Sequence, residues 1–103
     1  MKREDIVTTL ANVAKELASD YGVKSMALFG SVTTADWTPE NDVDVVVEFE
    51  GTAAFDRLFG LHDRLESLLG VRVDLVTRKG LRPRLLRTID EHSIRVARSS
   101  ALH

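Results

Sequence analysis

Apolar residues recur at helical spacing near the start of the chain. Between residue 4 and about residue 20 they are separated by four, three and four positions, at Ile6, Leu10, Val13 and Leu17. This period places them along one side of an amphipathic helix. Gly22 follows, and a glycine there is typical of a helix end. The pattern therefore predicts a helix over residues 4–20.

Three short apolar runs predict buried strands. The first covers residues 24–29 and ends at Gly30, which suits a strand leaving the core at a tight turn. The second covers residues 42–49, where the odd positions from 43 onward are apolar, and is the clearest strand in the chain. The third covers residues 71–76. Between the first two runs, residues 31–41 indicate one helical turn and then a loop, since Pro39 interrupts regular structure.

Two further helices complete the series. Residues 53–69 repeat apolar side chains at the helical period and are followed by Gly70. A last helix is predicted to begin at Pro83, after a Lys79-Gly80 turn, because proline is favoured at the first helical position. The helix between the second and third strands allows them to be parallel neighbours through a right-handed crossover. We expect an α/β (α+β) fold, in which a small mixed sheet of three to four strands packs with about three helices.

Length, composition and charge limit the chemistry. The chain has 103 residues, 44% hydrophobic and 29% charged, so we expect a single domain over residues 1–103. Cysteine is absent from the sequence, which excludes thiolate metal sites, and no signal-peptide core or membrane-length apolar run occurs, which favours a cytoplasmic location. Residues 1–50 hold 4 basic and 10 acidic side chains, and residues 51–103 hold 10 and 6. This division fits a metal-binding half and a phosphate-binding half, or simply solvated helix faces.

Three aspartates are candidate metal ligands. Asp42 and Asp44 are two positions apart, so in a strand their side chains project to the same face. Asp74 stands alone between apolar residues of the third strand. Carboxylates held close together repel each other unless a cation lies between them, and an oxygen-only set suits Mg²⁺. The alternatives are a chance Asp-Val-Asp and, for Asp74, a strand-end cap or an ion pair with Arg72 or Arg78.

The Gly30-Ser31 pair is a candidate phosphate-binding turn. Glycine lets the backbone approach a phosphate, and the N–H groups and hydroxyl that follow can hold its oxygens. The pair is a weak signal by itself. The combination is stronger, because Gly30-Ser31 is followed after ten residues by Asp42-Val43-Asp44 and later by Asp74 in another strand.

Residues 28–31, Leu-Phe-Gly-Ser, and residues 41–49, Asn-Asp-Val-Asp-Val-Val-Val-Glu-Phe, resemble the signature of the polymerase-beta-like nucleotidyltransferase superfamily. They are most similar to its minimal nucleotidyltransferase (MNT) members. The resemblance implies that Gly30 and Ser31 hold the outer phosphates of ATP or another nucleoside triphosphate. It also implies that Asp42 and Asp44 bind Mg²⁺, as two ions, and that Asp74 completes one metal site and accepts the proton of the attacking hydroxyl.

The same resemblance implies transfer of AMP from ATP to a hydroxyl on another protein. MNT proteins of this type are often antitoxins that silence a HEPN-domain toxin by modifying a tyrosine. Residues 33–35 depart from the pattern, because they read Thr-Thr-Ala where relatives commonly have Ala-Arg-Gly. The basic segment 78–87, with Arg78, Lys79, Arg82 and Arg84, could replace the arginine or be a solvated helix start. Without a replacement, the chain would be a catalytically silent module that neutralises its partner by contact.

The remaining candidates are weaker. Trp37, in the loop, either contacts a partner or a base or packs against the domain. We give no histidine a role and expect His62 to be a packing residue. The sequence has no extended basic surface for a nucleic-acid backbone and no membrane segment, and it leaves a homo-oligomer open.

Overall fold

The computed structural model describes residues 2–51 and 55–98, which form four helices and four strands. The helices are α1 (Arg3–Asn12), α2 (Ala14–Tyr21), α3 (Phe55–Leu69) and α4 (Pro83–His92). The strands are β1 (Val23–Phe29), β2 (Val43–Phe49), β3 (Val73–Thr77) and β4 (Ile94–Arg98). Two short 3-10 turns, η1 (Gly30–Thr33) and η2 (Arg78–Gly80), follow β1 and β3. The expected α/β architecture is confirmed.

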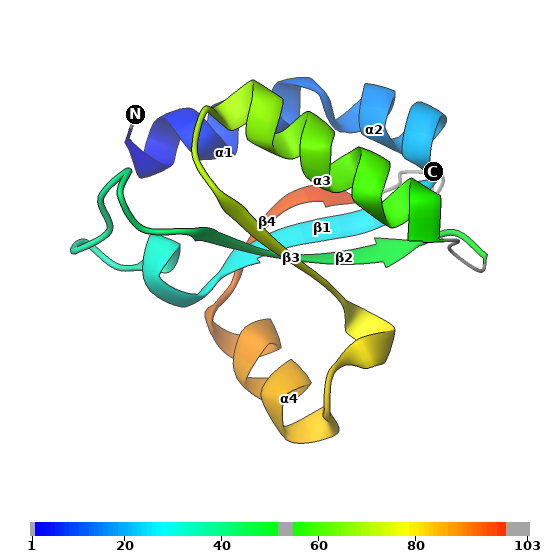
Figure 1. The fold of residues 1–103 in the computed structure, drawn as a ribbon. Helices are drawn as coiled ribbons and strands as arrows, with labels where there is room; N and C mark the ends of the chain where they lie inside the picture. The colour runs from blue at the N-terminus through cyan, green and yellow to red at the C-terminus, as the bar shows by residue number, and fades with distance from the viewer. Residues whose placement is uncertain (1, 52–54, 99–103) are drawn as a thin grey trace.

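One mixed sheet lies at the centre of the fold, with the strand order β3-β2-β1-β4. β1 is antiparallel to both β2 and β4, whereas β2 and β3 are parallel. The sequence had left parallel pairing open for the strands on either side of α3, and the structure shows it. Figure 1 shows α1, α2 and α3 on one face of the sheet and α4 on the other. Because β2 and β3 run in the same direction, residues at their starts lie at the same end of the sheet.

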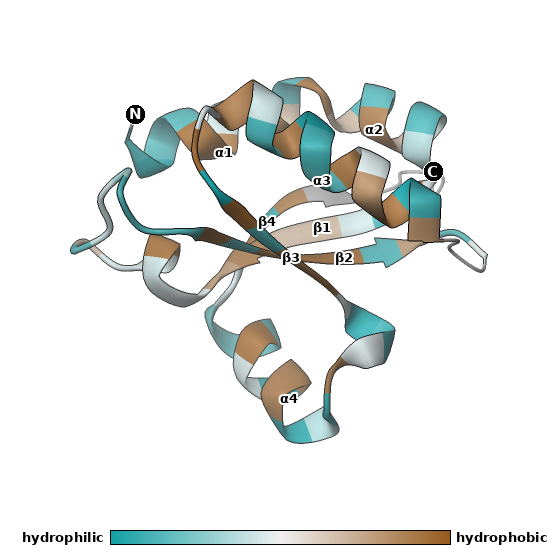
Figure 2. Ribbon diagram, viewed as in Figure 1, coloured by the Kyte–Doolittle hydropathy of each residue, from teal (hydrophilic) through white to brown (hydrophobic). Residues whose placement is uncertain are grey.

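β2 contributes to both layers by alternation of its side chains. Val43, Val45 and Val47 are fully buried in the main core, which also holds leucines of α1, α2 and α3. Val46 points to the opposite face and is also buried, as is Ile89 of α4. Figure 2 shows the strands as largely apolar and the helices as apolar mainly in stripes. Asp44 shares the Val46 face, so its carboxylate lies on the α4 side of the sheet.

The single helix predicted over residues 4–20 is two helices in the structure. α1 ends at Asn12, and Val13 interrupts the helix with φ −106° and ψ 10° before α2 begins. Asparagine and valine both have low helix propensity, valine because its side chain loses rotamer freedom and asparagine because its side chain competes for backbone hydrogen bonds. A break at this point therefore costs little free energy. Gly22 ends α2 in the left-handed region, with φ 70°, as predicted.

β4 is an element that the predicted series did not place. Its sequence alternates apolar Ile94 and Val96 with Arg95, which is the period of a strand. The strand bounds also shift, since β2 begins at Val43 and β3 spans Val73–Thr77 rather than residues 71–76. The fourth strand covers the side of β1 that faces away from β2.

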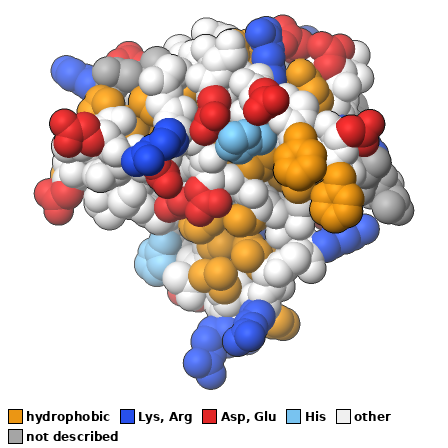
Figure 3. Space-filling model, viewed as in Figure 1, with side chains coloured by type: hydrophobic (Ala, Val, Ile, Leu, Met, Phe, Trp, Pro, Cys, Tyr) orange, Lys and Arg blue, Asp and Glu red, His pale blue; other side chains and the backbone are white. Residues whose placement is uncertain are grey.

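The surface carries an aromatic pair and a separation of charge. Phe55 and Phe59 of α3 are 77% and 62% exposed, and their rings stack with centroids 6.2 Å apart. Figure 3 shows acidic side chains gathered in the middle of one face and lysine or arginine side chains at its lower end, over α4. Within the ranges described above, every helix is too short or too polar to cross a membrane.

Candidate functional site

The register of β1 and β2 brings the Gly30-Ser31 turn beside Asp44. Phe29 is the antiparallel partner of Asp44, so the turn that follows Phe29 begins next to this carboxylate. Gly30 has φ +73°, and a β-carbon at this position would collide with the Asp44 carboxylate. Glycine is therefore needed both for the backbone conformation and for the close approach.

Side-chain hydrogen bonds hold the turn in shape. Thr33 Oγ1 donates to the Gly30 carbonyl and Thr34 Oγ1 donates to the Ser31 carbonyl, each at 2.7 Å. Arg3, at the start of α1, donates from Nη1 to the Thr33 carbonyl at 2.9 Å. Ser31 itself is exposed. The turn is thus fixed from within and from α1, with the Ser31 side available to a ligand.

Asp44 and Asp74 are direct neighbours on the parallel strands. Their Cα atoms are register partners. Burial raises the pKa of the Asp44 carboxyl, and the nearby charges of Asp74 and Asp42 and a hydrogen bond with Asp74 raise it further. The two carboxyls therefore disfavour simultaneous ionisation, which is the electrostatic situation that a bound cation relieves.

The Asp42 carboxylate makes an ion pair with an arginine. Arg72 Nε lies 3.1 Å from Asp42 Oδ1, and Arg72 Nη2 donates to the Glu40 carbonyl at 3.5 Å. Among the described residues, no three acidic or histidine side chains are arranged as a group that could hold a metal. The structure thus brings two of the three predicted ligands together and turns the third toward Arg72. The ion pair considered for Asp74 is made by Asp42 instead.

Trp37 packs against the domain. It is only 8% exposed, belongs to the main core, and donates from Nε1 to the Asp42 carbonyl at 3.3 Å. Of the two alternatives, the structure shows packing. The indole supports the loop that leads into β2 and so helps to position Asp42.

The basic segment begins at the opposite end of β3 from the aspartates. Four positions separate Asp74 from Arg78, which corresponds to about 13 Å along a strand. Arg78 makes two hydrogen bonds to the Asp90 carboxylate, at 2.8 and 3.1 Å, and they lower the pKa of Asp90. Arg78 is therefore paired with Asp90 at the end of β3 that lies away from the Gly30 turn. At this position it does not replace the arginine that is absent from residues 33–35.

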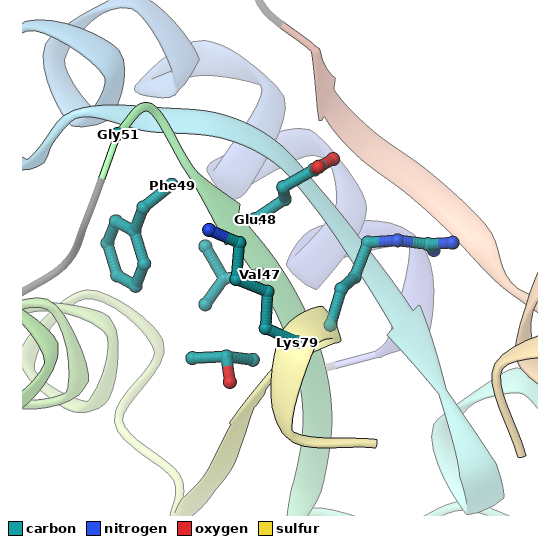
Figure 4. A pocket seen from close by; sticks show the side chains of 7 residues that line it. Val47, Glu48, Phe49, Gly51 and Lys79 are labelled. Carbon is teal, nitrogen blue, oxygen red and sulfur yellow. The ribbon is translucent and has the colours of Figure 1, made fainter. Parts of the chain in front are cut away.

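A pocket of about 220 Å³ lies at that opposite end. Figure 4 shows Val47, Phe49 and Lys79 around it, and Thr77 and Arg78 also line it. Asp42, Asp44 and Asp74 do not line this pocket. A second pocket, of about 410 Å³, lies between the start of α1 and the loop after η1.

Two arginines that contact the candidate site were not identified from the sequence. Arg3 reaches the turn from 30 positions away, and Arg72 pairs with Asp42 across the same distance in sequence. Neither contact follows a periodic pattern, because each depends on how α1 and β3 pack beside the loop. An isolated basic residue in a sequence gives no signal of such a contact.

Three comparisons with known proteins bear on this site. A family model described as the nucleotidyltransferase domain matches residues 10–96. Protein adenylyltransferase MntA of Thermococcus cleftensis is 35% identical over 86 residues, which cover 84% of this chain and 87% of that protein. A solved structure provisionally described as a minimal nucleotidyltransferase is 32% identical, with a TM-score of 0.78, over 91% of this chain and 95% of that one.

A more distant likeness concerns the fold alone. It is to a chain in the structure of a tri-AMPylated Shewanella oneidensis HEPN toxin in complex with an MNT antitoxin. The TM-score is 0.64 and the identity 21%, over 92% of this chain and 75% of that chain.

Proposed function

Since this chain belongs to the nucleotidyltransferase domain family, we propose that it transfers AMP from ATP to a hydroxyl group of a partner protein. The observation that carries the proposal is the pairing of Asp44 with Asp74 directly beside the Gly30 turn. The name of the Thermococcus relative supports transfer to protein. The Shewanella complex supports a HEPN-domain toxin as the partner, with this chain as the antitoxin. ATP as substrate agrees with a cytoplasmic location.

Mg²⁺ fits the donor chemistry of the three aspartates, because it is a hard cation that prefers carboxylate oxygens. Asp44 and Asp74 already lie together, and their mutual repulsion favours a cation. Asp42 is the third ligand, and it binds the metal after its ion pair with Arg72 breaks. When bound, two Mg²⁺ ions neutralise charge on the phosphate oxygens and on the departing pyrophosphate.

The chain's own residues position the reactants. The backbone at Gly30 and the Ser31 hydroxyl hold the outer phosphates, and the aspartates face the α-phosphate. Asp74 accepts the proton as the acceptor oxygen bonds to the α-phosphorus and the bond to pyrophosphate breaks. Asp74 is exposed on an edge strand, so a side chain of a large partner can reach it. Positioning and charge neutralisation provide most of the catalysis in phosphoryl and nucleotidyl transfer.

The deciding experiment measures transfer of labelled AMP from ATP to the partner protein. The protein is incubated with α-labelled ATP and Mg²⁺, with and without the product of the neighbouring gene, and each triphosphate is compared with ATP. We expect label on the partner with the wild type and background labelling with Asp42→Asn. Glu48→Gln, which removes a carboxylate from the far end of β2, is the matched control and should label normally.

Two outcomes contradict the proposal. Undiminished labelling by Asp42→Asn would refute the role of the carboxylates. Neutralisation of the partner by Asp42→Asn/Asp44→Asn, without any labelling by the wild type, would identify a binding module that acts by contact. The absence of an arginine from residues 33–35 is the observation that keeps this second function in view.

A further inference from the structure

The pocket between the start of α1 and the loop after η1 adjoins the phosphate-binding turn. Its volume is about 410 Å³, within the usual range for a small-molecule site. Lys2, Arg3 and Glu4 line one side, and Thr34 and Trp37 are among the residues on the other. Two of these side chains are cations and one is an anion. Thr34 follows directly on η1, so the loop that lines this pocket begins where the turn ends.

Arg3 is the residue that links this pocket to the turn. It is half-buried, and its guanidinium donates to the last carbonyl of η1, at Thr33. Arg3 makes no ion pair with any of the described residues, so its charge is not neutralised by a carboxylate. A guanidinium with further N–H donors beside a phosphate-binding turn is suited to bidentate binding of phosphate.

We propose that Arg3, together with Lys2, contacts the outer phosphates of the nucleoside triphosphate from this pocket. The inference rests on the proposed nucleotidyl transfer and adds residues that the family signature does not contain. η1 has four residues, so its two ends are about 8 Å apart, and one rotation of the Arg3 side chain spans most of that distance. Thr34 stands where relatives commonly have arginine, and Arg3 approaches the same place from α1. The charge that the loop lacks is thereby supplied by the start of the chain.

The test measures binding of ATP, AMP and inorganic tripolyphosphate in the presence of Mg²⁺, by calorimetry and without a partner protein. We expect Arg3→Gln to weaken ATP and tripolyphosphate binding about 10-fold and to leave AMP binding unchanged, because AMP has no outer phosphates. Arg3→Lys keeps the charge and should stay within about 3-fold of the wild type. Lys15→Gln removes a cation from the exposed side of α2 and should have no effect. Thermal unfolding of each variant is measured in parallel.

Each result decides between roles. Equal ATP affinity of the wild type and Arg3→Gln would overturn the role of Arg3 while leaving the transfer reaction intact. Equal weakening by Gln and Lys, with a lowered melting temperature, would show that Arg3 only braces the turn and would likewise overturn the phosphate contact. A wild type that binds neither ATP nor tripolyphosphate would refute both this inference and the proposed function.

Discussion

The two ends of the parallel pair β2 and β3 differ in both charge and shape. At the starting end, Asp44 and Asp74 pair beside the Gly30 turn. At the finishing end, Lys79 and Phe49 line an open, mainly apolar pocket. Shape does not decide between the two ends, because a pocket of about 410 Å³ lies near the turn and one of about 220 Å³ lies at the finishing end, where ligands commonly bind to parallel sheets. Charge and backbone geometry select the starting end. The site for metal and phosphate is thus identified by where its charges meet, because both ends have a pocket.

The largest expected contrast between the two ends comes from their glycines. Gly30 and Gly51 have nearly the same φ, 73° and 69°, but a β-carbon would strike Asp44 at Gly30 and meet nothing within 4 Å at Gly51. Left-handed backbone costs a non-glycine residue about 1–2 kcal/mol. We therefore expect Gly51→Ala to lose about 1 kcal/mol of unfolding free energy and Gly30→Ala about 2–3 kcal/mol. Thermal unfolding measures both.

Only the Gly30 variant should also lose Mg²⁺-dependent ATP binding, because its added methyl displaces the Asp44 carboxylate. Equal losses of stability in the two variants would show that the contact with Asp44 has no energetic weight.

An intermediate effect is expected from Asp44. Burial, followed by the charge of Asp74, raises the pKa of Asp44 above the ordinary value of an aspartate. The folded protein then binds more protons than the unfolded chain between these two pKa values, so its stability falls as pH rises through that window. In metal-free buffer, Asp44→Asn should raise the melting temperature at pH 7 by a few degrees and flatten the pH profile.

Glu48→Gln is the control, on the same face at the other end of β2. Ser25 Oγ donates to its carboxylate at 3.3 Å, so its removal should slightly lower the melting temperature. If the melting temperature of Asp44→Asn depends on pH as steeply as that of the wild type, the Asp44 carboxyl is not the group that causes this dependence.

The smallest effect concerns the ion pair between Arg72 and Asp42, whose side chains are 77% and 50% exposed. An exposed pair contributes at most about 1 kcal/mol, so releasing Asp42 should tighten metal binding by no more than about 5-fold. We expect Arg72→Gln to raise Mn²⁺ affinity by that order in a titration followed by electron paramagnetic resonance. Arg78→Gln removes the same charge at the other end and should change the affinity less. A lower affinity in Arg72→Gln than in Arg78→Gln would indicate that Arg72 orients Asp42 for the metal rather than competing with it.

The sequence was sufficient for most of the fold, because each main element has a strong period. The alternation in β2 and the helical stripe of α3 predicted their types, and the crossover length allowed the parallel pairing that the structure shows. β4 carried the same alternation in Ile94, Arg95 and Val96, but its short length hid it after α4. The division of the first helix at Val13 was less accessible, since a weak propensity rarely ends a helix by itself.

The sequence predicted only those parts of the site whose positions follow from strand pairing. Gly30, Asp44 and Asp74 lie together because strand pairing fixes their positions. The pairing of Asp42 with Arg72 and the approach of Arg3 depend on side-chain packing, for which the sequence gives no period. The same limit applies to Arg78 in the basic segment after β3, because its ion pair with Asp90 is a side-chain contact that the sequence does not indicate.

Asp74 lies on β3, which is an edge strand of the described sheet. An edge strand can pair with a strand of another molecule, and a charged side chain in a short edge strand discourages such pairing. Asp74 interrupts the apolar residues Val73, Leu75 and Val76 and is exposed, so we expect its charge to disfavour pairing at this edge. We therefore expect a neutral substitution of Asp74 to alter association at this edge as well as any transfer activity. Its effect on activity can be interpreted only when the association state of the variant is measured beside it.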